Sequence, residues 1–141
     1  MANRKISPRA SPRTSERLRA AGLRPTRQRR LLADLLFQHG HRHVTAELLH
    51  QEAKEAGCPV SLATVYNALH QFTDAGLLQQ VIVEASQSHF DTNVGPHQHF
   101  YEEEAGRLTD ISADIGVSGL PQPPKGTKIQ RVDVVVRIRR D

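Results

Sequence analysis

Apolar residues recur at helical spacing in several segments of the first half of the chain. The clearest stripe consists of four leucines between residues 31 and 36, where apolar positions three and four apart indicate one buried helix face. Thr26 precedes this stripe as a typical N-cap, and Gly40 ends it. The same combination of polar cap, apolar positions and glycine predicts further helices at residues 15–21, from Thr45 to Gly57 and from Ser61 to Gly76.

The helix that follows Ser61 is predicted to have two chemically distinct faces. Its buried face consists of Leu62, Val65, Leu69 and Phe72. The opposite face carries Ala63, Thr64, Asn67, His70 and Gln71, with Tyr66 on the flank. Surface helices usually carry Glu and Lys, whereas this helix has neither between Ser61 and Thr73. Its exposed side chains are instead small, neutral and able to form hydrogen bonds.

Strand-like segments follow these helices. Leu78–Glu84 and His89–Thr92 are predicted to be two strands joined by a turn at residues 85–88. Three or four short helices followed by a hairpin form a winged helix-turn-helix. In that fold the helix that begins after Ser61 enters the major groove of DNA.

The pattern changes at Gly95-Pro96, which is a hinge-like break. Beyond it, strands are predicted at His97–Tyr101, Arg107–Ile111 and Ile129–Ile138, with a helical turn at residues 112–120. A unit of about 45 residues with few aromatic side chains has little core of its own. We therefore expect it to pair with a second copy and form a homodimer.

The predicted fold class is α+β. We expect a flexible basic arm at residues 1–14, a winged-helix DNA-binding domain at 15–93 and a small α/β dimerisation domain at 94–141.

Composition excludes several classes of protein. The chain has 141 residues, of which 38% are hydrophobic, and no apolar run approaches the roughly 18 residues of a membrane span. Its one cysteine, Cys58, excludes an intramolecular disulfide and a four-cysteine zinc site. Because no secretory signal is visible either, we expect a cytoplasmic protein with no membrane association.

Charge is distributed unevenly along the chain. Residues 1–30 hold ten of the 19 basic residues and one acid, Glu16, whereas residues 31–141 hold 14 acids and nine basic residues. A basic block ahead of an acidic remainder indicates contact with a polyanion, most simply nucleic acid. A solvated basic tail is the alternative that charge alone leaves open.

The candidate DNA contacts lie on and near the helix after Ser61. Ser61 and Thr64 are placed to bind phosphate at a helix N-terminus. Asn67 and Gln71 have the amide pattern that pairs with adenine in the major groove. The Tyr66 ring suits a thymine methyl group, and its hydroxyl suits a phosphate. Arg24 is predicted to reach an A/T-rich minor groove, so the expected partner is A/T-rich double-stranded operator DNA.

The candidate metal ligands lie in the second half of the chain. His97 and His99 would project from the same face of a strand and bind one ion, with Asp91 and Asp110 nearby. Imidazoles and carboxylates without thiolate suit Fe, Mn or Zn. The other histidines are predicted to be ordinary surface residues: His39, His41, His50, His70 and His89. No nucleophile motif is present. We therefore expect no enzyme, and a small mononuclear metalloenzyme is the remote alternative.

Several motifs resemble those of the ferric uptake regulator family. They are G-L-R-P-T-x-Q-R at Gly22–Arg29, H-V-T-A-E at His43–Glu47, S-L-A-T-V-Y at Ser61–Tyr66, F-x-x-A-G-L at Phe72–Leu77 and H-x-H at His97–His99. The chain is most similar to the iron response regulator branch of that family. The similarity lies in D-T-N-V before the H-x-H, Phe100-Tyr101 after it, and the ending L-P-x-P-P-x-G…V-D-V-V-V-R.

The resemblance implies a winged-helix domain, a dimerisation domain and a regulatory metal site at the hinge between them. Carried over by motif, the ligands of that site are His43, Asp91, His97, His99 and Asp110. The structural zinc site of many relatives is absent, because Glu102 and Ala105 stand where the first cysteine pair would be.

The branch implies a function as well. It suggests an iron-responsive transcriptional regulator, mainly a repressor, of haem-biosynthesis and iron-homeostasis genes. Operator binding would be tuned by metal or haem, and haem or a haem-synthesis enzyme would be further partners. A zinc- or peroxide-sensing regulator of the same fold is the alternative.

Overall fold

The chain forms two compact units, Met1–Val94 and Gly95–Asp141. We analysed a computed structural model that describes residues 12–84 and 87–141. The predicted arm therefore lies largely outside the described residues. Its last three positions do not belong to an arm, because they begin the first helix.

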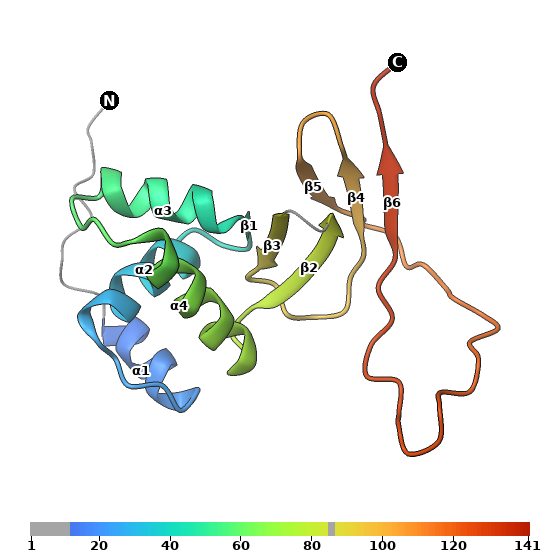
Figure 1. Ribbon diagram of the computed structural model, residues 1–141, viewed down its shortest axis with the longest axis horizontal. Helices are drawn as coiled ribbons and strands as arrows, with labels where there is room; N and C mark the ends of the chain where they lie inside the picture. The colour runs from blue at the N-terminus through green and yellow to red at the C-terminus, as the bar shows by residue number, and fades with distance from the viewer. Residues whose placement is uncertain (1–11, 85–86) are drawn as a thin grey trace. The chain divides into compact units, whose positions relative to one another are not determined.

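Four helices make up most of the first unit (Figure 1). They are α1 (Pro12–Ala20), α2 (Arg27–Phe37), α3 (Ala46–Glu55) and α4 (Leu62–Asp74). The predicted caps of the last three helices are confirmed. The side chains of Thr26, Thr45 and Ser61 each accept a hydrogen bond from the backbone N–H of the residue three positions later. The predicted start of α1 at Ser15 is wrong. The helix begins at Pro12 instead, and the fixed φ of proline suits the first helical position.

The core of the first unit is a cluster of aliphatic side chains together with Phe72 and Phe90, and every helix of the unit contributes residues to it. Val65, Leu69 and Phe72 of α4 are fully buried, as predicted. The prediction for Leu62 is wrong, because its side chain is 37% exposed. Ala68 is buried in its place. This shifts the centre of the buried stripe around the helix, so that Leu62 lies at its edge.

A three-stranded antiparallel sheet completes the first unit. It contains β1 (His43–Val44), β2 (Gln79–Glu84) and β3 (Gln87–Asp91) in the order β1-β3-β2. The pattern did not reveal β1, since two residues are too few to show alternation. The hairpin is confirmed, although β3 begins two residues earlier than expected. His89 lies on β3 and is buried, so its prediction as a surface histidine is wrong.

The second unit is a separate three-stranded sheet. Its strands are β4 (His99–Glu102), β5 (Arg107–Asp110) and β6 (Val135–Ile138), in the order β5-β4-β6. β4 pairs antiparallel with β5 and parallel with β6. The last strand is shorter than predicted, because the four residues of β4 pair with only four residues of β6.

The predicted helical turn at 112–120 is wrong, since these residues have no regular structure and residues 95–141 contain no helix. The α+β class holds for the described chain as a whole, with all helices in the first unit. No helix among the described residues is long and apolar enough to cross a membrane.

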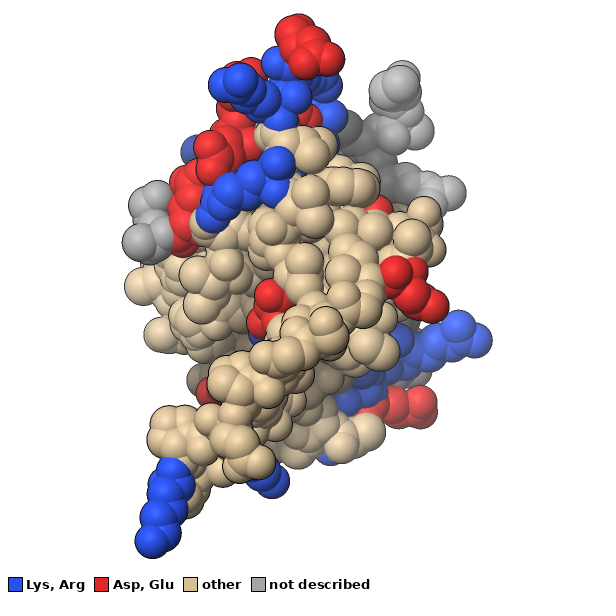
Figure 2. Space-filling model, turned by 90° about the vertical axis from the view of Figure 1, so that its right-hand side faces the viewer, with Lys and Arg blue, Asp and Glu red and all other residues tan. Residues whose placement is uncertain are grey.

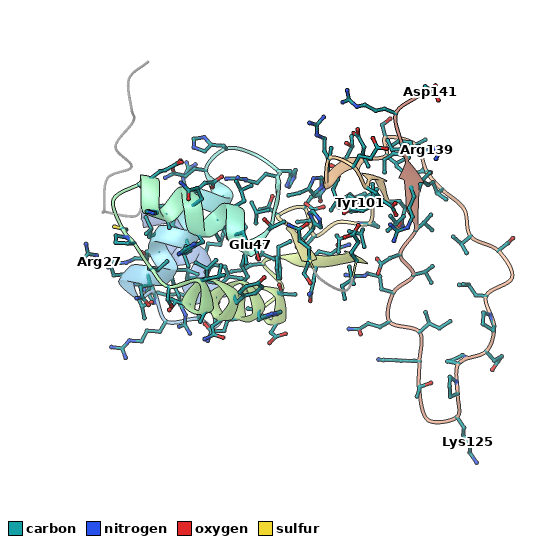
Figure 3. The ribbon with its side chains drawn as sticks, turned by 45° about the horizontal axis from the view of Figure 1, so that its top comes forward. Arg27, Glu47, Tyr101, Lys125, Arg139 and Asp141 are labelled. Carbon is teal, nitrogen blue, oxygen red and sulfur yellow. The ribbon has the colours of Figure 1, made fainter. Side chains whose placement is uncertain are left out.

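Charged side chains of both signs gather at one end of the second sheet (Figure 2). Arg137 of β6 pairs with Glu103 at 2.5 Å, and Arg140 pairs with Glu102 at 2.8 Å. Arg137 also lies over the ring of Tyr101, at 5.6 Å from its centroid. Tyr101, labelled in Figure 3, is the largest of the fully buried side chains among the described residues. These contacts hold β4 and β6 in register at the end farthest from His99.

Candidate metal centre and nucleic-acid interface

The exposed face of α4 forms a shallow groove with the start of α2. Thr64, Asn67 and Gln71 line the groove from α4, and Thr26, Gln28 and Arg29 line it from the other side. Its volume is about 350 Å³. Three of the predicted DNA contacts thus share one surface, at positions three and four apart on the helix.

Ser61 and Thr64 bond to each other at the start of α4. Their hydroxyl oxygens are 2.8 Å apart, and the Ser61 Oγ also accepts the Thr64 backbone N–H at 3.1 Å. Both residues retain hydroxyl capacity at a helix N-terminus, where a phosphate is favoured. Arg24 has an exposed side chain in the turn before α2.

Tyr66 does not present a free hydroxyl. Its O–H donates to Oε1 of Glu47 on α3 at 2.9 Å, and Figure 3 shows Glu47 between α3 and α4. This hydrogen bond to the carboxylate is the main reason that the pKa of Tyr66 lies above its ordinary value of 10.0. The ring is half-buried against the core of the first unit and stacks on His70, with centroids 6.4 Å apart. The part of the ring that stays accessible can make an apolar contact, such as with a thymine methyl group.

Glu47→Gln should lower the pKa of Tyr66 toward its ordinary value. The negative charge that opposes phenolate formation is removed, while an acceptor for the hydroxyl is retained. A spectrophotometric titration of the phenolate in a Tyr101→Phe background measures this directly, because the chain has only two tyrosines. Gln51→Glu is the matched control, since it adds a carboxylate elsewhere on α3. An unchanged titration midpoint in Glu47→Gln would show that Glu47 does not hold this hydroxyl in solution.

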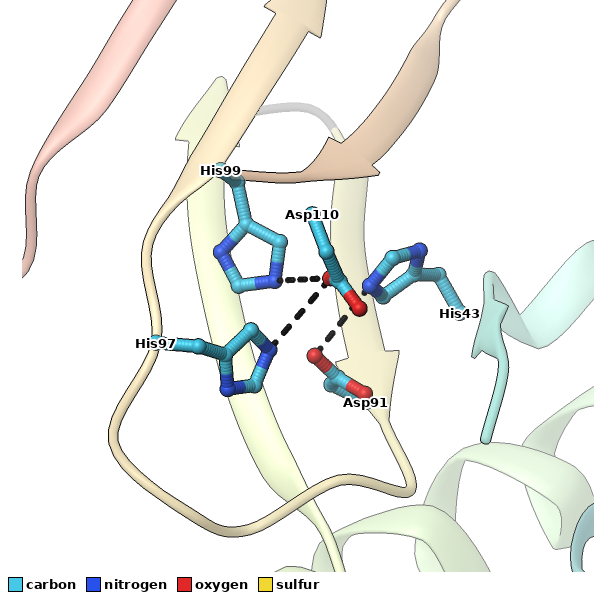
Figure 4. Close-up of side chains that lie close together, drawn as sticks. All are labelled: His43, Asp91, His97, His99 and Asp110. Carbon is cyan, nitrogen blue, oxygen red and sulfur yellow. Dashed lines mark ion pairs between the residues drawn. The ribbon is translucent and has the colours of Figure 1, made fainter. Parts of the chain in front are cut away.

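The first unit contributes one pair of the predicted metal ligands. His43 on β1 lies opposite Asp91 on β3 in the sheet register, and its Nε2 is 3.2 Å from Oδ2 of Asp91 (Figure 4). The Asp91 side chain is 1% exposed, and its other oxygen accepts the backbone N–H of Asn93 at 2.8 Å. The carboxylate is therefore held in one orientation.

A network that sequence reasoning missed fixes the strand that carries His43. Arg42 makes a bidentate pair with Glu52 of α3, at 2.9 and 2.6 Å, and also donates to the Leu35 carbonyl at 3.0 Å. Its backbone N–H donates to the Thr92 hydroxyl at 2.8 Å, and Thr92 donates its own N–H back to the Arg42 carbonyl. These partners are seven, ten and fifty residues away, so no local pattern indicates them.

The second unit brings the other three predicted ligands together. Nε2 of His97 and Nε2 of His99 each lie 3.4 Å from the same oxygen, Oδ1 of Asp110 (Figure 4). His99 opens β4 directly opposite Asp110, the last residue of β5. His97 precedes β4 rather than lying on it, so the prediction that both histidines project from one strand face is wrong. Their rings nonetheless meet edge to face, with centroids 4.5 Å apart.

Hydrogen bonding selects the tautomer of His97 that suits a ligand. Its Nδ1 lies 2.8 Å from the Gly95 carbonyl. A carbonyl can only accept, so Nδ1 carries the proton and the neutral ring keeps its lone pair on Nε2. Gln98, between the two histidines, anchors the segment, because its Oε1 accepts the Val134 N–H at 2.6 Å and its carbonyl accepts the Ile111 N–H at 2.9 Å.

The donor atoms fit a divalent transition metal. Two Nε2 atoms directed at one half-exposed carboxylate provide nitrogen and oxygen ligands without sulfur, a set that suits Fe(II), Mn(II) or Zn(II). Cys58 is not part of either ligand group. It is half-buried against the core of the first unit and lines a pocket with Arg27, Leu31 and Val60.

Comparison with known proteins places this arrangement in one family. The model of the ferric uptake regulator family matches residues 20–136, which includes both ligand groups and the whole of α4. The chain belongs to the ferric uptake regulator family. Proteins of this family are transcription regulators rather than enzymes, which agrees with the expectation from sequence and leaves the metalloenzyme alternative without support.

Individual relatives and solved structures agree with the family. The chain is 36% identical to the peroxide-responsive repressor PerR of Staphylococcus aureus strain Mu50 over 94 residues, which cover 67% of this chain and 63% of the relative. The fold is similar to that of the Vibrio cholerae ferric uptake regulator, with a TM-score of 0.70 and 24% identity over 89% of this chain and 98% of that one. The Pseudomonas aeruginosa ferric uptake regulator with manganese has a TM-score of 0.67 and 25% identity over 90% and 97%.

Proposed function

We propose that this chain is a metal-responsive, DNA-binding transcriptional regulator that acts as a homodimer. The observation that carries the proposal is the convergence of two histidine Nε2 atoms on one carboxylate in a member of this family. The uncharged, hydrogen-bonding face of α4 supports the DNA-binding part of the proposal. Such side chains read base edges, whereas Arg27 and Arg30 of α2 suit phosphates without regard to sequence.

We further propose that one divalent ion takes all five ligands: His43, Asp91, His97, His99 and Asp110. A bound ion supplies a positive centre that these imidazoles and carboxylates share. When the ion is bound, these ligands from the two units would be held in one fixed geometry, and this is how the chain would transmit the metal signal. DNA senses that geometry, since the spacing of two recognition helices in a dimer must match successive major grooves. The protein would exchange between a geometry that fits DNA and one that does not. Metal changes the populations of these two geometries only if it binds them with different affinities.

The described surface of the second unit supports dimerisation. Apolar side chains are exposed there on β6 and the segment before it, including Ile129, Val136 and Ile138. A three-stranded sheet of this size buries few side chains by itself. Pairing with a second copy would cover these apolar residues.

The identity of the signal separates two versions of the proposal. The resemblance to the iron response regulator branch supports iron and haem as signals for genes of haem synthesis and iron homeostasis. The similarity to a peroxide-responsive repressor supports peroxide as the signal instead. A haemin titration followed by absorbance tests the first version, and DNA binding after peroxide treatment of the Fe(II)-loaded and Mn(II)-loaded protein tests the second.

DNA affinity should depend on metal. DNA sequences are first selected from a pool of random duplexes, once with the Mn(II)-loaded protein and once with protein stripped of metal by a chelator. The selected sequences then serve as probes for fluorescence anisotropy. We expect affinity for the selected DNA to differ between the two forms by about 5- to 150-fold, the usual range of coupling between two sites. Equal affinity of both forms for every selected sequence would contradict metal-responsive regulation.

A further inference from the structure

Arg29 of α2 links α4, the helix proposed to enter the major groove, to the turn that precedes α2. Its Nε and Nη2 both donate to Oε1 of Gln71, at 3.3 and 3.0 Å. Its Nη1 donates to the Arg24 carbonyl at 2.9 Å. The guanidinium is therefore fixed by two partners. One of them is the exposed side chain of Gln71, which the sequence predicts to contact a base.

The chemistry of this pair fixes which way the Gln71 amide faces. A guanidinium has donors only, so the amide atom that faces it must be the carbonyl oxygen. Two N–H groups already occupy that oxygen. The amide NH₂ is directed away from Arg29 and is the group that Gln71 can offer to a ligand.

Gln71 is placed to meet a base. It is exposed, and it lines the same groove as Thr64 and Asn67, seven and four residues earlier on α4. A glutamine with a free amide reads adenine with both of its atoms, donating to N7 and accepting from the N6 amino group. With its oxygen engaged, Gln71 keeps only the donating half of that pattern.

We propose that Arg29 is a specificity-determining residue that makes Gln71 a donor-only reader of the major groove. This inference rests on the proposed DNA-binding function. Gln71 then selects a base whose major-groove edge offers acceptors, guanine with O6 and N7 or thymine with O4. Adenine offers one acceptor, N7, beside its N6 amino group, and cytosine offers only its N4 amino group, so both are disfavoured. The adenine contact predicted from sequence for Gln71 is replaced by this preference.

Selection from random duplexes by the full-length Mn(II)-loaded protein tests the proposal. Comparison with Gln71→Ala identifies the position that Gln71 reads, because only that position should lose its preference. In the unmodified protein this position should favour guanine or thymine. Arg29→Met frees the amide oxygen, and the preference should move toward adenine by about tenfold, the scale of one good base contact. Gln71→Glu keeps the partner of Arg29 but has no NH₂, so it should lose the preference for guanine and thymine.

Arg30→Met is the matched control, because it removes the same charge from the next position of α2. It should lower affinity for all sequences alike and leave the base preference unchanged. The same uniform loss in Arg29→Met, without a change of preference, would show that Arg29 serves phosphate only and would overturn this inference alone. A protein that enriches no sequence at any position would overturn the proposed DNA-binding function together with this inference.

Discussion

The double variant His97→Ala/His99→Ala should lose tight binding of divalent metal. Both Nε2 atoms that approach Asp110 are removed, which leaves only His43, Asp91 and Asp110 of the five proposed ligands. Loss of a single outer-shell partner commonly weakens metal binding by about 10- to 100-fold, so removal of two direct ligands should weaken it by well over about 100-fold. Calorimetric titration with Mn(II) or Zn(II) measures both the affinity and the number of ions bound per chain.

The matched control is His39→Ala/His70→Ala, which removes the same number of imidazoles from exposed positions outside the ligand groups. It should bind metal as the unmodified chain does. Circular dichroism of both variants shows whether the sheets persist. Unchanged affinity and stoichiometry in the His97→Ala/His99→Ala variant would place the metal elsewhere in the chain.

His43 should contribute less to metal affinity than the histidine pair. It approaches a single carboxylate, that of Asp91, with which it shares the pairing of β1 and β3. The two histidines of the second unit instead share one oxygen and are fixed by Gly95, Gln98 and the β4–β5 register. Geometry that is already organised reduces the entropy lost when a ligand binds.

Signals within a few residues were sufficient to predict where α2, α3 and α4 begin. The cap side chains of Thr26, Thr45 and Ser61 each accept the backbone N–H of the residue three positions later, so each capping interaction lies within one helical turn. The His97-Gln98-His99 motif is local in the same sense. Its ring positions are not set by strand alternation, however, because His97 lies before β4 and is oriented by the Gly95 carbonyl.

Contacts between distant residues could not be predicted in this way. Arg29 reaches Gln71 across 42 residues, and Arg42 reaches Thr92 across 50. Which hydrogen-bonding atoms Gln71 keeps for a ligand depends on the first of these contacts. The pairing of His43 with Asp91 depends on β1, a strand of two residues. Only the resemblance to a known family indicated His43 as a ligand.

The recognition-helix variant Tyr66→Ala/Asn67→Ala should weaken binding to selected DNA by roughly 10- to 100-fold or more, because each lost base contact costs about 1–3 kcal/mol. Binding to random DNA should persist, since the arginines of α2 remain and supply the salt-dependent part of affinity. Fluorescence anisotropy at several salt concentrations separates the two contributions. Gln51→Ala, which removes an exposed amide from α3, is the control for loss of a polar surface side chain.

Tyr66→Phe identifies the part of Tyr66 that contacts DNA. The hydroxyl donates to Glu47, so the ring edge is the group that remains for a thymine methyl. The phenylalanine variant should therefore retain most of the affinity that Tyr66→Ala loses. Equal losses in the two variants would instead show that the hydroxyl leaves Glu47 and bonds to the DNA itself. If even Tyr66→Ala/Asn67→Ala binds selected DNA as the unmodified chain does, the exposed face of α4 is not the surface that reads the operator.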